Sequence, residues 1–124
     1  MDRAALLVCE PDELTDALEQ LHALECVTRS QLLELVRAMR AREDWKIDGA
    51  SSLGEWVAIR LGIRVSVARD IVRVAAALEQ LPKIAAVFAT GAMSWDQLRA
   101  LTYIATPDTD GQWAGDVSTL TVAG

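Results

Sequence analysis

Residues 51–74, SSLGEWVAIRLGIRVSVARDIVRV, decide the fold of this chain. Ala58 is followed four positions later by Gly62, and apolar residues recur at the spacing of two short helices joined by a tight turn. Ala lets two helices approach closely, and Gly can take the positive φ that such a turn requires. This stretch therefore predicts a helix-turn-helix-like pair within residues 52–81. The residues predicted to point inward are Val57, Leu61, Ile63, Ala68 and Ile71.

The same pattern leaves basic side chains outward, as a candidate DNA-binding surface. Arg69 and Arg73 lie four apart on one face of the second helix. Ser66 is predicted to cap that helix and to donate to a phosphate at its N-terminus. An ordinary solvated face is the alternative, since many helix pairs bind no DNA and Asp70 would weaken phosphate contact. The candidate DNA-binding residues are Arg60, Arg64, Ser66, Arg69 and Arg73.

Residues that typically begin or end helices occur within and around this helix pair. A capping box opens its first helix, a proline begins a short helix after its second, and another capping box opens the helix after that. Residues 46–105 are thus predicted to form a four-helix segment, in which the second helix runs to about Leu81 and the last to about Ala105. These signals are Ser52 with Glu55, Pro82, and Ser94 with Gln97, and the helix-ending glycines are Gly62 and Gly91.

A long amphipathic helix is predicted upstream, over residues 11–45. Pro11 suits a first helical position, and the acidic residues after it complement the positive end of a helix. Apolar residues recur at three- and four-residue spacing, but Glu25 and Thr28 interrupt this stripe at one level. A kink or break near residues 25–30 is therefore an alternative to one continuous helix.

The length of this helix predicts a partner for its apolar stripe. About thirty helical residues span roughly 45 Å, which is more than four short helices can cover. Part of the stripe is therefore predicted to contact a second copy or a full-length relative, and packing within the chain is the alternative. The candidate interface residues are Leu14, Leu18, Leu21, Leu32, Leu35 and Met39.

The composition indicates a single all-α domain. Of the 124 residues, 52% are apolar, which suffices for a core, but only 5% are aromatic, and Ala and Leu dominate. We predict a long N-terminal helix followed by a bundle of short helices. Residues 1–10 are predicted to be a tail. Residues 106–124 are predicted to begin a further element at Thr106-Pro107-Asp108, which looks cut short at Gly124.

The charge distribution limits where DNA could bind. A net charge of −6 argues against nonspecific coating of nucleic acid. Residues 52–105, however, carry six basic and four acidic side chains, so any DNA-facing surface is expected there. Apolar runs are too short for a membrane span or a signal peptide. Cys9 and Cys26 have neither metal-site nor redox spacing, so we expect a soluble cytoplasmic protein with free thiols.

Few residues are available for catalysis. The chain has no asparagine and one histidine, His22, in the middle of the predicted long helix. It also lacks a glycine-rich phosphate-binding loop and a pairing of Ser or Cys with His. The acidic residues after Pro11 are better explained by the positive helix end than by a metal site. We therefore expect no catalytic residue, no metal, no cofactor and no small-molecule substrate.

Several segments together resemble a known family. They are DGASSLGEWVA at 48–58, RLGI at 60–63, LEQLP at 78–82, GAMS at 91–94 and ATP at 105–107. No single segment is specific, but their order and spacing are similar to those of the actinobacterial 13E12 repeat family, also called domain of unknown function 222. The resemblance covers the chain from about Leu14 to its C-terminus.

The resemblance implies DNA as the general context. In that family the domain commonly precedes a C-terminal HNH endonuclease domain, and members are associated with repetitive, prophage-like elements. An HNH site needs paired histidines and usually an asparagine to bind one metal ion and activate water. Since His22 alone cannot supply that site, the chain resembles a truncated member that lacks the nuclease.

The sequence leaves three hypotheses open. The first is a non-catalytic DNA-associated module that uses the outward arginines. The second is a protein-interaction or dimerisation module that uses the long N-terminal helix and does not contact DNA. The third is a degenerate mobile-element remnant with no retained activity.

Overall fold

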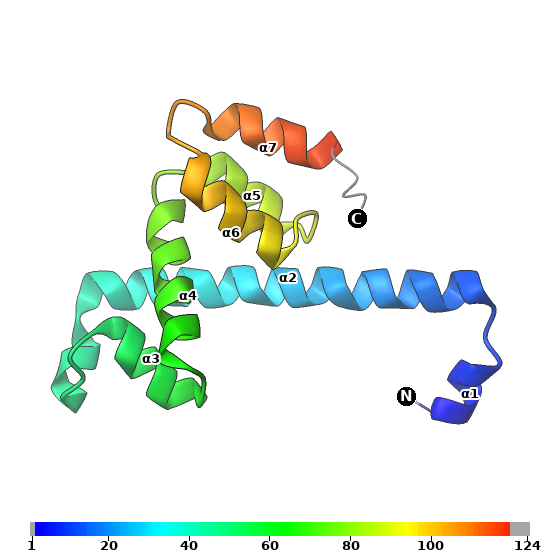
Figure 1. Ribbon diagram of the computed structural model, residues 1–124, viewed down its shortest axis with the longest axis horizontal. Helices are drawn as coiled ribbons and strands as arrows, with labels where there is room; N and C mark the ends of the chain where they lie inside the picture. The colour runs from blue at the N-terminus through cyan, green and yellow to red at the C-terminus, as the bar shows by residue number, and fades with distance from the viewer. Residues whose placement is uncertain (1, 120–124) are drawn as a thin grey trace.

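The computed structural model describes residues 2–119, whose regular elements are all helical (Figure 1). This confirms the predicted all-α class, with a long N-terminal helix followed by shorter ones. Within these residues, no helix combines the length and apolar character needed to cross a membrane. The elements are α1 (Arg3–Leu7), α2 (Pro11–Arg42), the 3₁₀ helix η1 (Asp44–Asp48), α3 (Leu53–Leu61), α4 (Val65–Leu78), α5 (Pro82–Ala89), α6 (Trp95–Ile104) and α7 (Asp110–Thr119).

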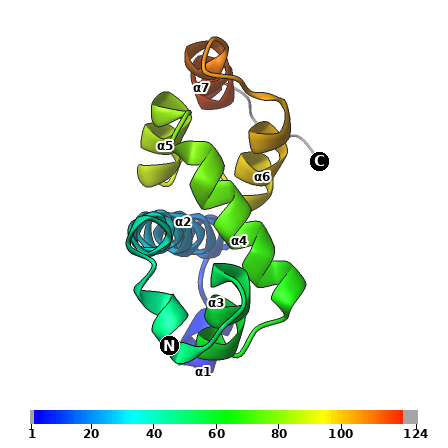
Figure 2. The same ribbon diagram turned by 90° about the vertical axis from the view of Figure 1, so that its left-hand side faces the viewer.

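Helix α2 is a rod that extends beyond the rest of the molecule. Figure 1 shows α4 crossing the C-terminal half of α2, with α3 on one side of the rod and α5, α6 and α7 on the other. The view in Figure 2, turned by 90°, shows the same two groups on either side of α2. The first turns of α2 project past these helices toward α1.

The core lies where α4 crosses α2. Helix α2 contributes Cys26, Leu33 and Val36, each at most 4% exposed. These side chains belong to one cluster with the buried faces of α4 and α5, and α2 contacts both helices. The largest buried residues of α4 and α5 in that cluster are Ile71, Val74, Leu78, Ile84 and Phe88.

A buried carboxylate joins α7 to α5. Asp110, the first residue of α7, accepts hydrogen bonds from the backbone N–H groups of Lys83 (2.8 Å) and Ile84 (2.9 Å). Helix α5 has no side-chain cap from its own N-cap residue, Leu81. Asp110 therefore satisfies two N–H groups that a helix N-terminus leaves without partners, across a tertiary contact.

Local signals place most helix ends as predicted. Ser52 accepts a hydrogen bond from the backbone N–H of Glu55, and Ser94 forms a complete capping box with Gln97. The capping box predicted for Ser52 and Glu55 is incomplete, because the Glu55 carboxylate accepts from the Ser51 hydroxyl and does not bond the backbone N–H of Ser52. Gly62 (φ +66°) and Gly91 (φ +84°) take the left-handed conformation just after helices α3 and α5.

Helix α2 runs without a break through residues 25–30, the region where a kink was the alternative. Thr28 does not cap a new helix there, because its hydroxyl donates to the backbone carbonyl of Leu24 (2.9 Å). The helix ends at Arg42, three residues before the predicted end, since Glu43 takes a left-handed conformation (φ +63°).

Other ends differ from the prediction. Helix α4 ends at Leu78, not near Leu81. Helix α7 begins at Asp110, because Thr106 forms a hydrogen-bonded turn with Thr109 ahead of the helix. The predicted tail contains α1. The predicted cut at Gly124 lies outside the described residues.

Candidate nucleic-acid interface

Helices α3 and α4 and the turn between them form at the predicted positions. The backbone N–H of Gly62, in its left-handed conformation, donates to the carbonyl of Ala58, as does that of Ile63. Ala58 and Ala68 are both buried, which allows close contact between the two helices. The pair is therefore compact and has the short turn expected of a helix-turn-helix.

Gly54 lies at a point where α3 and α4 approach each other closely. A Cβ atom at this position would lie 2.9 Å from Cγ and 3.4 Å from Cα of Arg69. A larger residue would therefore push α4 away from α3. Sequence reasoning gave Gly54 no role, because the glycine requirement comes from a helix that packs against it and leaves no local pattern.

The predicted inward residues are mostly buried. Val57, Ala68 and Ile71 are at most 3% exposed, and Ile63 is partly buried against the core. The prediction for Leu61 was wrong, because its side chain is 51% exposed at the end of α3. Leu61 lines a groove between α2 and the α3–α4 turn.

Three of the five predicted DNA-binding residues lie exposed at the N-terminal end of α4. They are Arg64, Ser66 and Arg69. The prediction that Ser66 caps α4 was wrong, since the helix begins at Val65 and Arg64 is its N-cap residue, without a side-chain capping bond. The Ser66 hydroxyl is therefore not committed to a cap. Among the described residues, neither Arg64 nor Arg69 has an ion pair.

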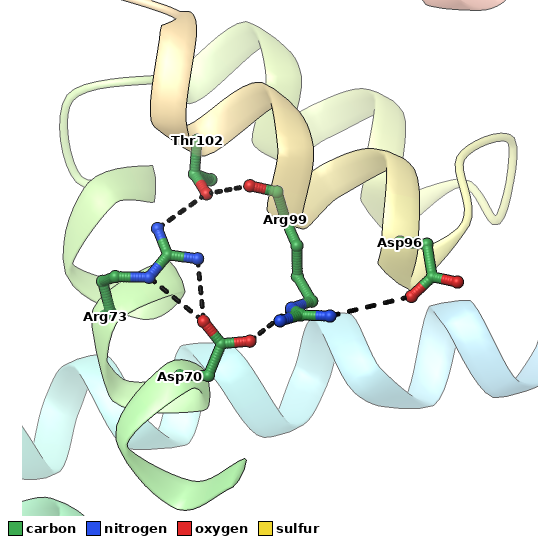
Figure 3. Close-up of polar contacts among 5 residues, drawn as sticks. All are labelled: Asp70, Arg73, Asp96, Arg99 and Thr102. Carbon is green, nitrogen blue, oxygen red and sulfur yellow. Dashed lines mark hydrogen bonds and ion pairs between the residues drawn. The ribbon is translucent and has the colours of Figure 1, made fainter. Parts of the chain in front are cut away.

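Arg73, the fourth residue, is held by neighbouring side chains (Figure 3). Its Nε and Nη2 donate to Oδ1 of Asp70 (3.1 and 2.8 Å), and its Nη1 donates to the Thr102 hydroxyl (3.0 Å). The guanidinium carbon also lies 3.9 Å from the ring centroid of Tyr103. Arg73 therefore ties α4 to α6, and only part of its charge faces solvent.

A second arginine completes this cluster. Figure 3 shows Arg99 of α6 contacting the other carboxylate oxygen of Asp70 and reaching toward Asp96, 3.9 Å away. Asp70 thus lies between two guanidinium groups, as the central anion of an α4–α6 brace. The spacing of Asp70 and Arg73 could indicate their pair from sequence, but no sequence signal joins either residue to Arg99.

Arg60, the fifth residue, binds the end of η1. Its Nη2 and the indole Nε1 of Trp56 both donate to Oδ2 of Asp48, at 3.0 and 2.8 Å. The Arg60 guanidinium also lies over the Trp56 ring, 5.1 Å from its centroid. These two hydrogen bonds, that of Trp56 first, lower the pKa of Asp48.

The predicted partner interface of α2 is divided between exposed and partly buried residues. Leu14, Leu18, Leu21 and Leu35 are exposed, from 40% to 70%. Leu32 and Met39, in contrast, pack partly against the core. The residues of α2 that enter the core most deeply, Leu33 and Val36, lie beside the predicted stripe and were not assigned to it.

His22 and Cys26 lie on α2, and Cys9 lies just before it. None of the groups of His, Cys, Asp and Glu among residues 2–119 could hold a metal ion. Cys26 lies 3.9 Å from the His22 ring, but burial raises the pKa of its thiol, and the nearby charge of Glu25 adds to this effect. Both cysteines are free thiols. The buried environment of Cys26 disfavours its reactive thiolate form.

A family model described as "Domain of unknown function (DUF222)" matches residues 12–122. The matched range begins in the first turn of α2 and includes the α3–α4 pair and the α4–α6 brace. No match to a curated protein or to a solved structure was found.

Proposed function

The chain belongs to the DUF222 family, and we propose that it is a non-catalytic module that contacts duplex DNA through the first turns of α4. One observation carries this proposal: Arg64, Ser66 and Arg69 lie exposed at the N-terminal end of the second helix of a helix-turn-helix-like pair. In proteins with this motif, that end of the second helix is the part that enters the major groove.

The chemistry of this end suits a phosphate backbone. The N-terminus of α4 carries the positive end of the helix dipole and free backbone N–H groups. Arg64 and Arg69 add two cations that no carboxylate among the described residues neutralises. With so few free cations per chain, binding is expected to be weak and its salt dependence modest, about 0.9 in the slope of log K against log salt for each phosphate contact.

The remaining candidate residues support α4 instead of contacting DNA in this proposal. Arg73 and Arg99 hold Asp70 between α4 and α6, which fixes the direction of α4 relative to the rest of the bundle. Arg60 fixes η1 against α3 in the same way. The family resemblance, whose members often carry an HNH endonuclease domain, supports DNA as the context of this proposal.

The experiment is fluorescence anisotropy with a labelled generic duplex over a salt series. The test variant is Arg64→Glu/Arg69→Glu, and the control is Arg3→Glu/Arg42→Glu, which makes the same charge change on exposed residues of α1 and α2. We expect the test variant to bind much more weakly and the control to retain most of its binding. Loss of two phosphate contacts lowers the salt dependence by about 2 in the slope of log K against log salt.

Two results would contradict the proposal. Equal loss in both variants would mean that only net charge matters, and absence of binding by the unmodified chain at low salt would exclude DNA contact by these residues. Circular dichroism checks that each variant folds, which is expected because all four replaced side chains are exposed.

A second candidate function is binding to another protein through α2. The observation that favours it is the row of exposed leucines on α2, where Leu18 is 70% and Leu35 is 62% exposed. Isolated exposed leucines are common on protein surfaces, but a row along one helix is typical of an interface. A chain that binds neither DNA nor protein would fit the third hypothesis, a remnant without activity.

A further inference from the structure

We propose that two copies of this chain associate through antiparallel α2 helices. The proposal rests on the second candidate function and is independent of DNA contact. Together with Glu25 and Thr28, the six predicted interface residues of α2 form one row from Leu14 to Met39, with alternating steps of four and three residues. This is the heptad spacing of a two-stranded coiled coil, in which such a row lies against its counterpart.

The row has the same pattern from either end of the helix. In an antiparallel pair with its two-fold axis between Cys26 and Val27, every leucine of the row meets an apolar residue of the other copy. The facing pairs are Leu14 with Met39, Leu18 with Leu35, and Leu21 with Leu32. Each pair occurs twice, once on either side of the axis. The row therefore fits a second copy of itself.

The polar residues of the row set the alignment of the two helices. In this arrangement Glu25 of one copy faces Thr28 of the other, beside the axis, so the polar residues of both copies share one layer. The Thr28 hydroxyl, which donates to the Leu24 carbonyl within its own helix, would have to turn from it to donate to the Glu25 carboxylate. A shift by one heptad would place Glu25 against a leucine and bury its charge without a partner. A single polar layer in an apolar seam selects one register for this reason.

The charges of α2 favour the antiparallel direction. Residues 11–25 carry five acidic side chains and no Lys or Arg, whereas residues 29–42 carry four Arg and one Glu. An antiparallel pair places the acidic half of each helix beside the basic half of the other. A parallel pair would place the two acidic halves together, which costs free energy through repulsion.

The folded body leaves space beside the row for a second helix. A groove of about 680 Å³ runs between α2 and the α3–α4 turn. Leu21 and Leu32 line its α2 side, and Leu61 and Val67 line the opposite side. Leu61 and Val67 are about half exposed, at 51% and 47%. The middle of the other α2, residues 21–32, would cover them, which accounts for the exposure of Leu61.

A second groove lies farther along α2, toward its C-terminal end. It has a volume of about 430 Å³, and Leu35, Met39 and Trp45 contribute to its walls. In the antiparallel pair it lies opposite Leu14 of the other copy. The two grooves thus lie where the proposed pair needs space.

Sedimentation equilibrium over a range of protein concentrations tests the association. We expect a monomer–dimer equilibrium in the unmodified chain, and Leu18→Glu is expected to raise Kd about 100-fold or more, because it replaces two buried leucines per dimer with carboxylates. Ile104→Glu is the control, since Ile104 is an exposed residue of α6 outside the row. It should leave Kd unchanged, and circular dichroism should show both variants folded.

Disulfide cross-linking tests the direction, in a background of Cys9→Ser and Cys26→Ala. A mixture of Leu18→Cys and Leu35→Cys chains should form mixed dimers on oxidation. Leu18→Cys chains alone should not, because their thiols would lie on the order of 25 Å apart along the pair.

The results of these experiments distinguish failure of self-association from failure of the proposed functions. A chain that stays monomeric at every concentration overturns self-association, while a different protein could still bind the row and the DNA assay is unaffected. Cross-linking of Leu18→Cys chains alone, as efficiently as the mixture, overturns the antiparallel arrangement.

Discussion

Helix α4 and the N-terminal half of α2 have similar apolar spacing but different surroundings. In α4 the apolar face is closed, with Ala68, Ile71 and Val74 at most 2% exposed. In α2 the corresponding residues Leu14 and Leu18 are 40% and 70% exposed. The difference arises because α4 is packed against α2, α3, α5 and α6, whereas the first turns of α2 project past all of them. Amphipathic spacing thus identifies a face but does not show what covers it.

The largest expected effect is a difference in stability between a truncation in α4 and one in the N-terminal half of α2. Ile71→Ala is expected to lower the free energy of unfolding by about 2–5 kcal/mol, because it opens a cavity in the core. Leu18→Ala should change it by less than about 0.5 kcal/mol at concentrations where the chain is monomeric. Denaturant unfolding followed by circular dichroism measures both. Similar losses in the two variants would show that the N-terminal half of α2 is covered within the chain.

A smaller loss of stability is expected when the contact between α7 and α5 is removed. Asp110→Ala should lower the free energy of unfolding by about 1–3 kcal/mol, because it leaves the backbone N–H groups of Lys83 and Ile84 without acceptors. The control is Asp108→Ala, at an exposed carboxylate two residues earlier. Thermal unfolding of both variants gives the comparison, and equal shifts would rule out a special role for Asp110.

The reactivities of the two cysteine thiols should differ between the exposed start of α2 and the part of α2 that is packed in the core. Cys9, just before α2, is partly exposed, whereas Cys26 is 3% exposed where α2 enters the body. Burial also raises the pKa of Cys26, so it has less thiolate near neutral pH. In the native protein, a thiol reagent should modify Cys9 in a fast phase and Cys26 in a slow one. The Cys9→Ser variant isolates Cys26, and rapid modification there would mean that this part of α2 opens readily.

The smallest effect concerns Asp48, at the edge of the body. The hydrogen bonds from Trp56 and Arg60 lower its pKa below the ordinary value of 3.8. Its contribution to stability is therefore present above the unfolded-state pKa and is lost as the pH falls through the lower folded-state pKa. Trp56→Phe removes the larger cause, so the pKa should rise toward 3.8. Carboxyl titration by NMR measures this shift, and an unchanged value would show that Trp56 does not act on Asp48.

The candidate DNA-binding surface was only partly predictable. Arg64 and Arg69 are exposed as the helical spacing indicated, because the pattern on α4 itself decides which of its faces is apolar. Arg73 was placed on the same face, yet it is held by Asp70 and Thr102. The contact with Thr102 depends on α6, which begins more than twenty residues later, so the pattern of α4 could not reveal it.

The interface residues of α2 show the same limit. The regular spacing of Leu14 to Met39 was visible, but Leu33 and Val36 on the adjacent face enter the core that α2 shares with α4 and α5. Several faces of α2 carry leucines in this region, and sequence spacing does not distinguish between them. The way the other helices pack on α2 determines which of its faces is buried.

The sequence by itself determined the helices and most of their ends. Ser52, Gly62 and Ser94 act through backbone groups only a few residues away, so their effect can be read locally. Tertiary structure decided which face of α2 is buried, why Gly54 must be small, and how Asp70 joins Arg73 to Arg99. These features depend on contacts between residues far apart in the chain, where the geometry of packing selects one arrangement among several that the local pattern allows.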